Sequence, residues 1–373
     1  MQQLPLSFQE NVVFQLRALY NQYGYSQYKM NKFEEYDLYA RNKDFLISDS
    51  VITFMDTNGK LMAMKPDVTL SIVKNSKDNL EALQKLYYNE TVYRVSKNTR
   101  SFKELMQVGL ECLGSIDDYC ICEVLMLAAQ SLRRISQDCI LDISHLGLLS
   151  ELMDTMGVPG SSKNALLKCI GEKNSHELVA LCRSCGITEE NIALLKQVVT
   201  TSGSPETVLP KLQQLLDGIM DTGTVAQLIR ITEALANSSI RDMLRFDLSV
   251  VDDIRYYNGI VFKGFIHTVP SSVLSGGQYD KLMQKMHKKS GAIGFAVYVD
   301  ALERLDRQQE TYDVDTVVLY SEGVSLSAVQ AQVNALRAEG RSVMVQRCLP
   351  EHIHCRQILK LTGSEVEILE NNA

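Results

Sequence analysis

The sequence lacks the features that mark several large classes of proteins. Acidic residues outnumber basic ones, 45 to 38, so there is no overall positive charge of the kind that binds nucleic acid. No apolar run approaches the ~18–20 residues of a membrane-spanning helix. The N-terminal segment MQQLPLSFQENVVFQL has no basic stretch followed by an apolar one. We therefore expect no secretory signal, no membrane partner and a cytoplasmic location.

Metal-binding patterns are also sparse. Nine cysteines without a secretory signal indicate reduced thiols rather than a disulfide framework. Cys182 and Cys185 form a CxxC pair that no second pair accompanies. His352, His354 and Cys355 form one short cluster near the end of the chain, a pattern that is more often a loop than a ligand set. We therefore expect no metal and no cofactor.

The composition that is present is that of a globular protein. The 373 residues are 45% hydrophobic and 22% charged, which is enough for two or three domains with a sizeable core. Apolar residues at helical spacing predict a helix over 8–23, and the Thr57-Asn58-Gly59 turn predicts a hairpin. Two longer strands are expected at 83–94 and 105–113, joined by a polar and basic loop at 95–103.

The second half of the chain changes texture twice. A Leu-rich stretch of about 148–236 predicts a helical insertion, after which strands resume at 244–251, 260–266 and 291–299. A helix at 301–309 and a charged linker precede a β-α-β pattern that starts at Thr316. We therefore expect an α+β core over 1–310, with an antiparallel sheet flanked by helices, and a short C-terminal α/β domain over 311–373.

Three segments, in this order and spacing, resemble the catalytic core of histidyl-tRNA synthetase, a class II aminoacyl-tRNA synthetase. They are MKPDVTLSIVKN, then VYRVSKNTRSFKELMQVGLE, then IRYYNGIVFKGF followed by SGGQYDKLM and AIGFAVYVDALERL. The resemblance covers roughly residues 8–305 and is weakest in the helical insertion. It implies a class II synthetase-like core that forms a homodimer, and a C-terminal domain similar to a truncated anticodon-binding domain.

The resemblance also implies a set of contacts to free histidine, and each matching side chain suits its part. Carboxylates and a hydroxyl suit the ammonium and the imidazole N–H, an arginine suits the carboxylate, and two aromatic rings provide a wall. The expected histidine-binding residues are Asp67, Thr69, Arg94, Gln107, Glu111, Tyr256 and Tyr257.

Each of these residues also has a purely structural interpretation. Asp67 and Thr69 suit the cap of a helix that starts near them. Arg94 and Glu111 suit a cross-strand pair. The adjacent tyrosines suit one core ring and one surface ring in a strand. Taken singly, these interpretations are the commoner ones, but the full set in family order favours the pocket.

The sequence departs from the synthetase where ATP would bind. Adenylation builds charge on phosphates, and each lost cation typically costs a few kcal/mol of transition-state stabilisation. Family arginines are replaced at several places, and an acidic residue is lost from the loop that follows Arg94 within the second segment. The positions concerned are Asp252, Ala301 (unless Arg304, about one turn on, takes its place), Gln278, Lys65 and Ser96. We therefore expect no catalytic residues and no aminoacylation.

The chain thus keeps the residues that match the histidine contacts and loses those that match the ATP contacts. In this it resembles the regulatory-subunit family of ATP phosphoribosyltransferase, paralogues of the synthetase in histidine biosynthesis. That resemblance implies L-histidine as allosteric ligand. It also implies a hetero-octamer with the short-form catalytic subunit, which gains activation and feedback control. A tRNA partner is not expected, because the short C-terminal domain has no basic-aromatic stripe and ends in LENNA.

Other interpretations stay open at the level of sequence. The chain also fits a divergent histidyl-tRNA synthetase, or a synthetase-like accessory protein with another amino acid as ligand. A basic group in the core domain fits either contact with an acidic partner or an ordinary solvated loop. It consists of Lys65, Lys97, Arg100 and Lys103.

Overall fold

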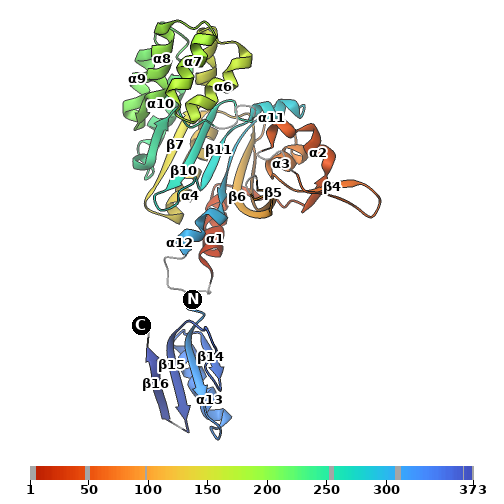
Figure 1. Cartoon of the computed structure of the whole chain (residues 1–373), viewed down its shortest axis with the longest axis vertical. Coiled ribbons are helices and arrows are strands. Elements are labelled where there is room, and N and C mark those ends of the chain that lie inside the picture. Colours follow the sequence, from red (N-terminus) through yellow and green to blue (C-terminus); the bar gives the residue numbers. More distant parts are fainter. Residues whose placement is uncertain are drawn as a thin grey trace. The chain divides into compact units, whose positions relative to one another are not determined.

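A computed structural model describes residues 6–46, 51–96, 99–251, 256–306, 312–363 and 365–371, without the side chains of residues 44, 304 and 306. The chain forms two compact units, one of Ser7–Glu303 and one of Arg304–Ala373 together with Met1–Leu6 (Figure 1). Among the described residues, no helix combines the length and the apolar character needed to cross a bilayer.

The larger unit is built on a nine-stranded sheet within the described part of the chain. Neighbouring strands are antiparallel except for two parallel pairs, β1 with β5 and β7 with β9, so the expected antiparallel core is confirmed. In spatial order the strands are β1 (Ser26–Gln27), β5 (Gln84–Val95), β6 (Phe102–Gly114), β12 (Gly291–Tyr298), β11 (Leu274–Gln278), β10 (Ile260–Ile266), β7 (Cys139–His145), β9 (Leu244–Asp247) and β8 (Ser202–Gly203).

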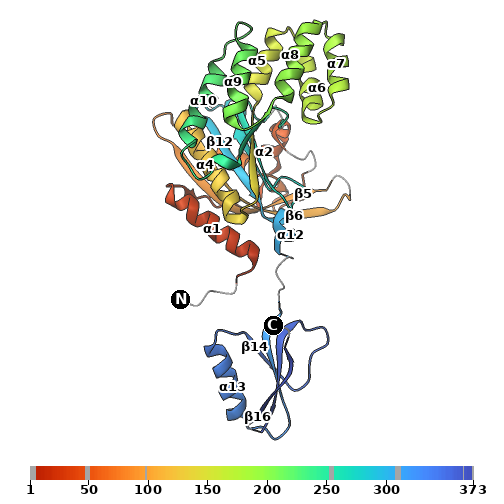
Figure 2. The same cartoon turned by 90° about the vertical axis from the view of Figure 1, so that its left-hand side faces the viewer.

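Two helices cover one face of this sheet, α1 (Phe8–Gln22) and α4 (Asp118–Ile135) (Figure 2). The ring of Phe295 on β12 lies 6.0 Å from that of Tyr20 on α1. Gly264 on β10 leaves the space that Leu132 of α4 fills, since a Cβ there would meet Leu132 at 2.7 Å. Because side chains alternate along a strand, the neighbours of Phe295 and Gly264 face the other way.

That other face carries the cavity described below, under a smaller layer. The layer consists of α2 (Tyr36–Arg41), a 3-10 turn (Lys43–Phe45), α3 (Thr69–Asn75) and a three-stranded sheet of β2 (Phe33–Glu35), β4 (Leu61–Met64) and β3 (Thr53–Met55). The predicted hairpin joins β3 to β4, and the Asp56 carboxylate accepts the N–H of Asn58 at 2.8 Å and that of Lys60 at 2.7 Å. Leu70 and Ile72 of α3 pack with Tyr88 of β5 in one core cluster.

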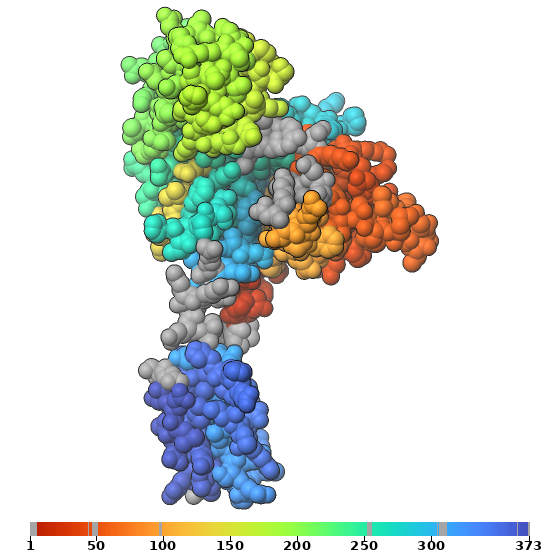
Figure 3. Space-filling model, viewed as in Figure 1, coloured from red at the N-terminus to blue at the C-terminus, as the bar shows by residue number. Residues whose placement is uncertain are grey.

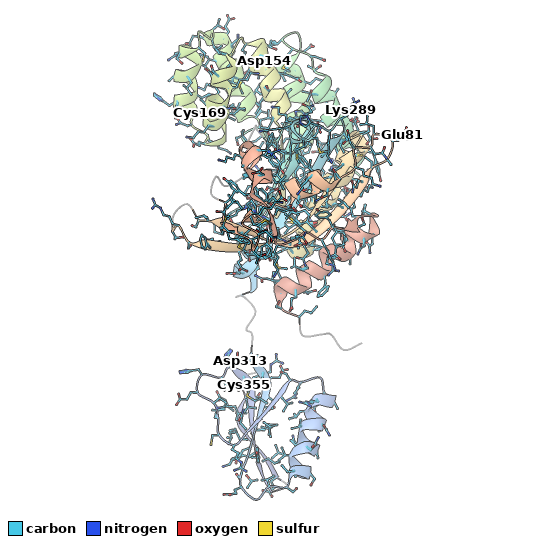
Figure 4. All side chains as sticks on the ribbon, turned by 90° about the vertical axis from the view of Figure 1, so that its right-hand side faces the viewer. Glu81, Asp154, Cys169, Lys289, Asp313 and Cys355 are labelled. Atoms are coloured by element: carbon cyan, nitrogen blue, oxygen red, sulfur yellow. The ribbon has the colours of Figure 1, made fainter. Side chains whose placement is uncertain are left out.

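The helical insertion follows β7 and ends before β9, as predicted (Figure 3, green). Asp154, labelled in Figure 4, accepts a hydrogen bond from Lys163, and this bond joins the first helix of the insertion to the second. The helices are α5 (Leu146–Thr155), α6 (Gly160–Gly171), α7 (Ser175–Ser184), α8 (Glu189–Thr200), α9 (Pro205–Leu216) and α10 (Gly223–Leu235), followed by a 3-10 turn (Arg241–Met243).

The chain returns through β10, β11, α11 (Asp280–Lys285) and β12 to a 3-10 turn (Val299–Leu302) and the short α12 (Glu303–Asp306). The expected helix at 301–309 is therefore partly confirmed, and residues 307–309 lie outside the described residues. Strand β11 coincides with the glycine-rich motif SGGQ, which the sequence pattern did not distinguish from a loop. The basic loop is also shorter than expected, because β5 runs to Val95 and β6 begins at Phe102.

The smaller unit is a four-stranded sheet with one helix against it. The expected β-α-β pattern is confirmed as β13 (Val314–Tyr320), α13 (Leu326–Ala338) and β14 (Val343–Gln346), and two unexpected strands follow, β15 (Cys355–Thr362) and β16 (Glu365–Asn371). Strands β14, β13 and β15 are parallel, and β16 is antiparallel to β15. Asp313, labelled in Figure 4, accepts the N–H of His354 at 2.8 Å just before β15.

Candidate functional site

All seven predicted histidine contacts line one cavity of about 300 Å³ on the sheet face opposite α1 and α4. Strand register explains why. Side chains alternate between the two faces of the sheet along β6, and Gln107 and Glu111 both lie on the cavity face. On the neighbouring strand β12, Gln107 pairs with Tyr298 and Glu111 pairs with Gly294. The remaining lining residues are Phe45, Leu46, Tyr88, Lys263, Ser272, Ser275, Tyr279, Gly294, Phe295, Ala296 and Tyr298.

Glu111 is the most enclosed acidic group of the cavity, with 2% of its surface exposed. One carboxylate oxygen accepts the Thr69 hydroxyl at 2.7 Å, and the other accepts the Tyr279 hydroxyl at 2.6 Å. Glycine at position 294 makes room for this carboxylate, because a Cβ there would lie 1.8 Å from Oε2. The glutamate of β6 is thus held in one orientation by hydroxyl groups from α3 and from the residue before α11, over a glycine of β12.

Burial raises the pKa of Glu111 to about 8, although the bonds from Tyr279 and Thr69 work in the opposite direction. The nearby Asp67 carboxylate raises this pKa further. Near neutral pH the group is therefore mostly protonated in the ligand-free chain. A ligand that offers an N–H donor or a positive charge favours the ionised carboxylate, so binding of such a ligand is coupled to proton release.

Asp67 has both of the roles that the sequence allows. It precedes α3 and accepts the backbone N–H of Leu70 at 2.8 Å, as a capping residue does, and it also lines the cavity. Burial raises the pKa of Asp67, while the Leu70 bond and the Arg94 charge lower it. Thr69 has no such capping bond, because its hydroxyl donates to Glu111.

Two of the structural interpretations are wrong. Arg94 pairs with Lys103 across the β5–β6 hairpin, and its Nε donates to the Pro66 carbonyl at 3.0 Å, whereas the β5 partner of Glu111 is Leu86. They are therefore not a cross-strand pair.

The adjacent tyrosines also do not alternate between core and surface. Tyr256 and Tyr257 precede β10 rather than lying in a strand, their ring centroids are 4.7 Å apart, and both line the cavity. Tyr256 also lies 5.6 Å from the ring of Tyr279. The three rings form one aromatic wall beside Glu111.

Several lining residues were not expected from the sequence. Tyr279 lies in the quoted motif SGGQYD, and Lys263 lies in IRYYNGIVFKGF, so the signal for both was proximity to matched residues. Ser275 and Tyr298 likewise lie in the quoted motifs SGGQYDKLM and AIGFAVYVDALERL, whereas Tyr88 carries no local signal, because only strand register places it on the cavity face.

Only some of the departures from the synthetase pattern lie among the described residues. Asp252 and the Arg304 side chain lie outside the described residues, and Ala301 lies in the 3-10 turn after β12. Gln278 donates to the Asp280 carboxylate at 2.7 Å.

The expected basic group needs a correction. Lys65 directly follows β4, is 2% exposed and forms an ion pair with Glu90 at 2.5 Å. It therefore does not join Arg100 and Lys103 on the surface, and Lys97 lies outside the described residues.

Comparison with known proteins agrees with this geometry. The family model described as histidyl-tRNA synthetase matches residues 6–302. The chain belongs to the histidyl-tRNA synthetase family. Membership in this family accounts for the class II synthetase-like sheet.

Individual members of the family narrow the comparison. An ATP phosphoribosyltransferase regulatory subunit of Caldanaerobacter subterraneus subsp. tengcongensis is 28% identical over 346 residues, which are 90% of this chain and 89% of that protein. A crystal structure of an ATP phosphoribosyltransferase regulatory subunit/histidyl-tRNA synthetase from Bacillus halodurans has a TM-score of 0.77 and 22% identity, and covers 95% of this chain and 93% of that one. A chain of an ATP phosphoribosyltransferase complex from Thermotoga maritima has a TM-score of 0.62 and 20% identity, and covers 80% of this chain and 98% of that one. At these identities the two structures establish the fold.

Proposed function

We propose that this chain is the non-catalytic regulatory subunit of ATP phosphoribosyltransferase. It binds L-histidine in the cavity around Glu111 and assembles with the short-form catalytic subunit, as a homodimeric core within a hetero-octamer. The name of the relative from Caldanaerobacter, which is similar over 90% of this chain, supports the assignment. The Thermotoga structure, described as a complex, supports a partner subunit.

One observation carries the proposal: the described charged groups of the cavity suit a zwitterion. Asp67 and Glu111 provide two carboxylates, and Arg94 and Lys263 provide two cations. A free amino acid brings one ammonium and one carboxylate, which such a set can meet. A nucleoside triphosphate brings several negative charges onto one end, and its transfer chemistry requires a concentration of cations there.

The imidazole is the part of the ligand that selects this cavity. The ionised Glu111 accepts a ring N–H, since its two oxygens have lone pairs beyond those used by Thr69 and Tyr279. The rings of Tyr256 and Tyr257 provide a flat wall against which an imidazole packs. Asparagine and glutamine carry a planar N–H donor without an aromatic ring, and tryptophan carries one on a much larger ring.

Histidine can control a catalytic partner only through different affinities for two arrangements of the complex. Activation and feedback both follow if assembly favours the active arrangement and histidine binds the inactive one more tightly. The coupling is then reciprocal, so that the catalytic subunit changes the affinity of this chain for histidine by the same factor.

The test is reconstitution with a short-form ATP phosphoribosyltransferase. The proposal expects the two chains to co-purify, the transferase activity to depend on this chain, and histidine to inhibit the complex. Calorimetry of this chain with the set of amino acids should give heat with histidine alone. Activity of the catalytic chain that is indifferent to this one contradicts the proposal, and heat with another amino acid in place of histidine indicates an accessory protein of a different kind.

A second candidate is a divergent histidyl-tRNA synthetase, which the name and extent of the matching family model favour. ATP–pyrophosphate exchange in the presence of histidine separates the two functions. We expect no exchange, and robust exchange would establish the synthetase.

A further inference from the structure

The floor of the cavity is made of small residues between two charged side chains. Glu111 on β6 faces Gly294 on β12, and Lys263 on β10 faces Ser275 on β11, which in turn pairs with Ala296 on β12. All five line the cavity. The Glu111 carboxylate covers Gly294, and alanine and serine rise little above the sheet, so the open space lies over Ala296 of β12 and Ser275 of β11, with the glutamate at one side and the lysine at the other.

The dimensions of the sheet fit a single amino acid in this trough. Strands β6 and β10 are three places apart, so the backbones that carry Glu111 and Lys263 are about 14 Å apart. The two side chains extend toward the trough and occupy part of this distance. Glu111 is in register with Gly294 of β12 and Lys263 with Ala296 of the same strand. The two side chains are therefore offset by two residues, about 6.8 Å, along the strand direction.

Arg94 is placed less well for the same ligand. Across the sheet, Lys263 is in register with Ser275, Ala296, Gly109 and Tyr88, in that order. Arg94 is on the same strand as Tyr88 but six residues further along it, so it lies away from this register. Its Nε is also engaged by the Pro66 carbonyl.

Hydroxyl groups accompany the lysine. Ser275 Oγ and the Tyr298 hydroxyl lie 2.5 Å apart, next to Lys263. The Lys263 side of the cavity therefore combines a cation with two hydroxyl groups, which is the composition of a carboxylate-binding subsite.

We propose that Lys263, with Ser275, binds the α-carboxylate of the amino-acid ligand whose imidazole contacts Glu111. This inference rests on the proposed function, because it requires histidine in the cavity. It assigns the two ends of the ligand to opposite sides of one trough. Lys263 then determines the preference for a free amino acid over an ester or amine that carries the same ring.

The experiment measures binding of L-histidine and of L-histidine methyl ester by calorimetry, to the full chain and to two variants. Lys263→Met removes the cation and keeps a long apolar stem. Lys211→Met, at an exposed lysine of α9 outside the cavity, is the matched control. Thermal unfolding of each variant checks that the fold is kept.

We expect the unaltered chain to bind histidine about 10- to 100-fold more tightly than the ester, since a hydrogen bond to a charged group contributes ~1.5–3 kcal/mol. In Lys263→Met this preference should fall to about twofold or less, by loss of histidine affinity alone, while the control keeps it. An unchanged ratio in Lys263→Met, or an equal loss for both ligands, overturns this inference and leaves the proposed function intact. Absence of histidine binding to the unaltered chain overturns the proposed function, and this inference with it.

Discussion

The hydroxyl of Tyr279 donates to the carboxylate of Glu111 at 2.6 Å, across 168 residues of sequence. This bond joins the residue between β11 and α11, whose ring belongs to the aromatic wall, to strand β6, which carries the buried acid. It sets the Glu111 oxygen against Gly294, where no side chain competes for the space. The cavity is arranged around this one carboxylate, which accepts the imidazole N–H under the proposed function.

Glu111→Gln should weaken histidine binding by about 10- to 100-fold, because the amide loses the charge that strengthens the bond to the imidazole N–H. Calorimetry measures the change. Glu104→Gln, at an exposed position of the same strand, is the control and should bind histidine normally. A purely structural role for Glu111 would instead lower the melting temperature of the Gln variant and leave its affinity unchanged.

The raised pKa of Glu111 predicts a pH dependence of stability in the ligand-free chain. The unfolded-state pKa is near 4.5 and the folded-state value is about 8, so the folded state binds the proton more tightly. The stabilisation is complete below pH 4.5 and is lost as pH rises through 8. The melting temperature of the unaltered chain, minus that of Glu111→Gln, should therefore fall between pH 5 and pH 9. A difference that is constant across this range contradicts the assigned titration.

Gly294→Ala should remove histidine binding and destabilise the fold by ~1–3 kcal/mol, because the added Cβ overlaps the Glu111 carboxylate. Denaturant unfolding and calorimetry measure the two effects. Gly160→Ala is a matched control, since a Cβ at position 160, at the start of α6, meets no atom within 4 Å. The control should bind histidine normally and unfold at the same denaturant concentration or slightly above it.

The ion pair of Lys65 and Glu90 should be needed for stability rather than for ligand binding. Lys65 is buried, so Glu90→Gln leaves an uncompensated charge and should cost about 3–5 kcal/mol in chemical unfolding. Glu35→Gln breaks the exposed pair of Glu35 with Lys60 and should leave the melting temperature almost unchanged. Equal effects of the two substitutions would mean that Lys65 is reached by solvent.

Asp252→Arg should not restore adenylation, because other arginine positions of the synthetase pattern are also changed, including Ala301 and Gln278. ATP–pyrophosphate exchange with histidine measures this directly. Recovery of exchange in the single variant would show that one substitution alone separates this chain from an active synthetase.

Local patterns in the sequence were enough to predict much of the fold. Apolar periodicity identified α1 and the helical insertion, and the Asn-Gly turn identified the β3–β4 hairpin, because these signals depend on residues close in sequence. Family order likewise singled out seven of the side chains that line the cavity. Strand β11 was not distinguished, because its glycines have the composition of a turn and only their neighbours in the sheet make them a strand.

What the sequence determined by itself is thus the set of elements and the side chains able to contact an amino acid. Only the tertiary structure decided which of them meet. The place of β12 between β6 and β11 sets Gly294 beside Glu111, and the same register sets Lys263 across the trough. The burial of Lys65 against Glu90 was also a tertiary outcome. The physical reason is that register and layer packing are fixed by contacts between residues far apart in the chain, which no local pattern of residue types encodes.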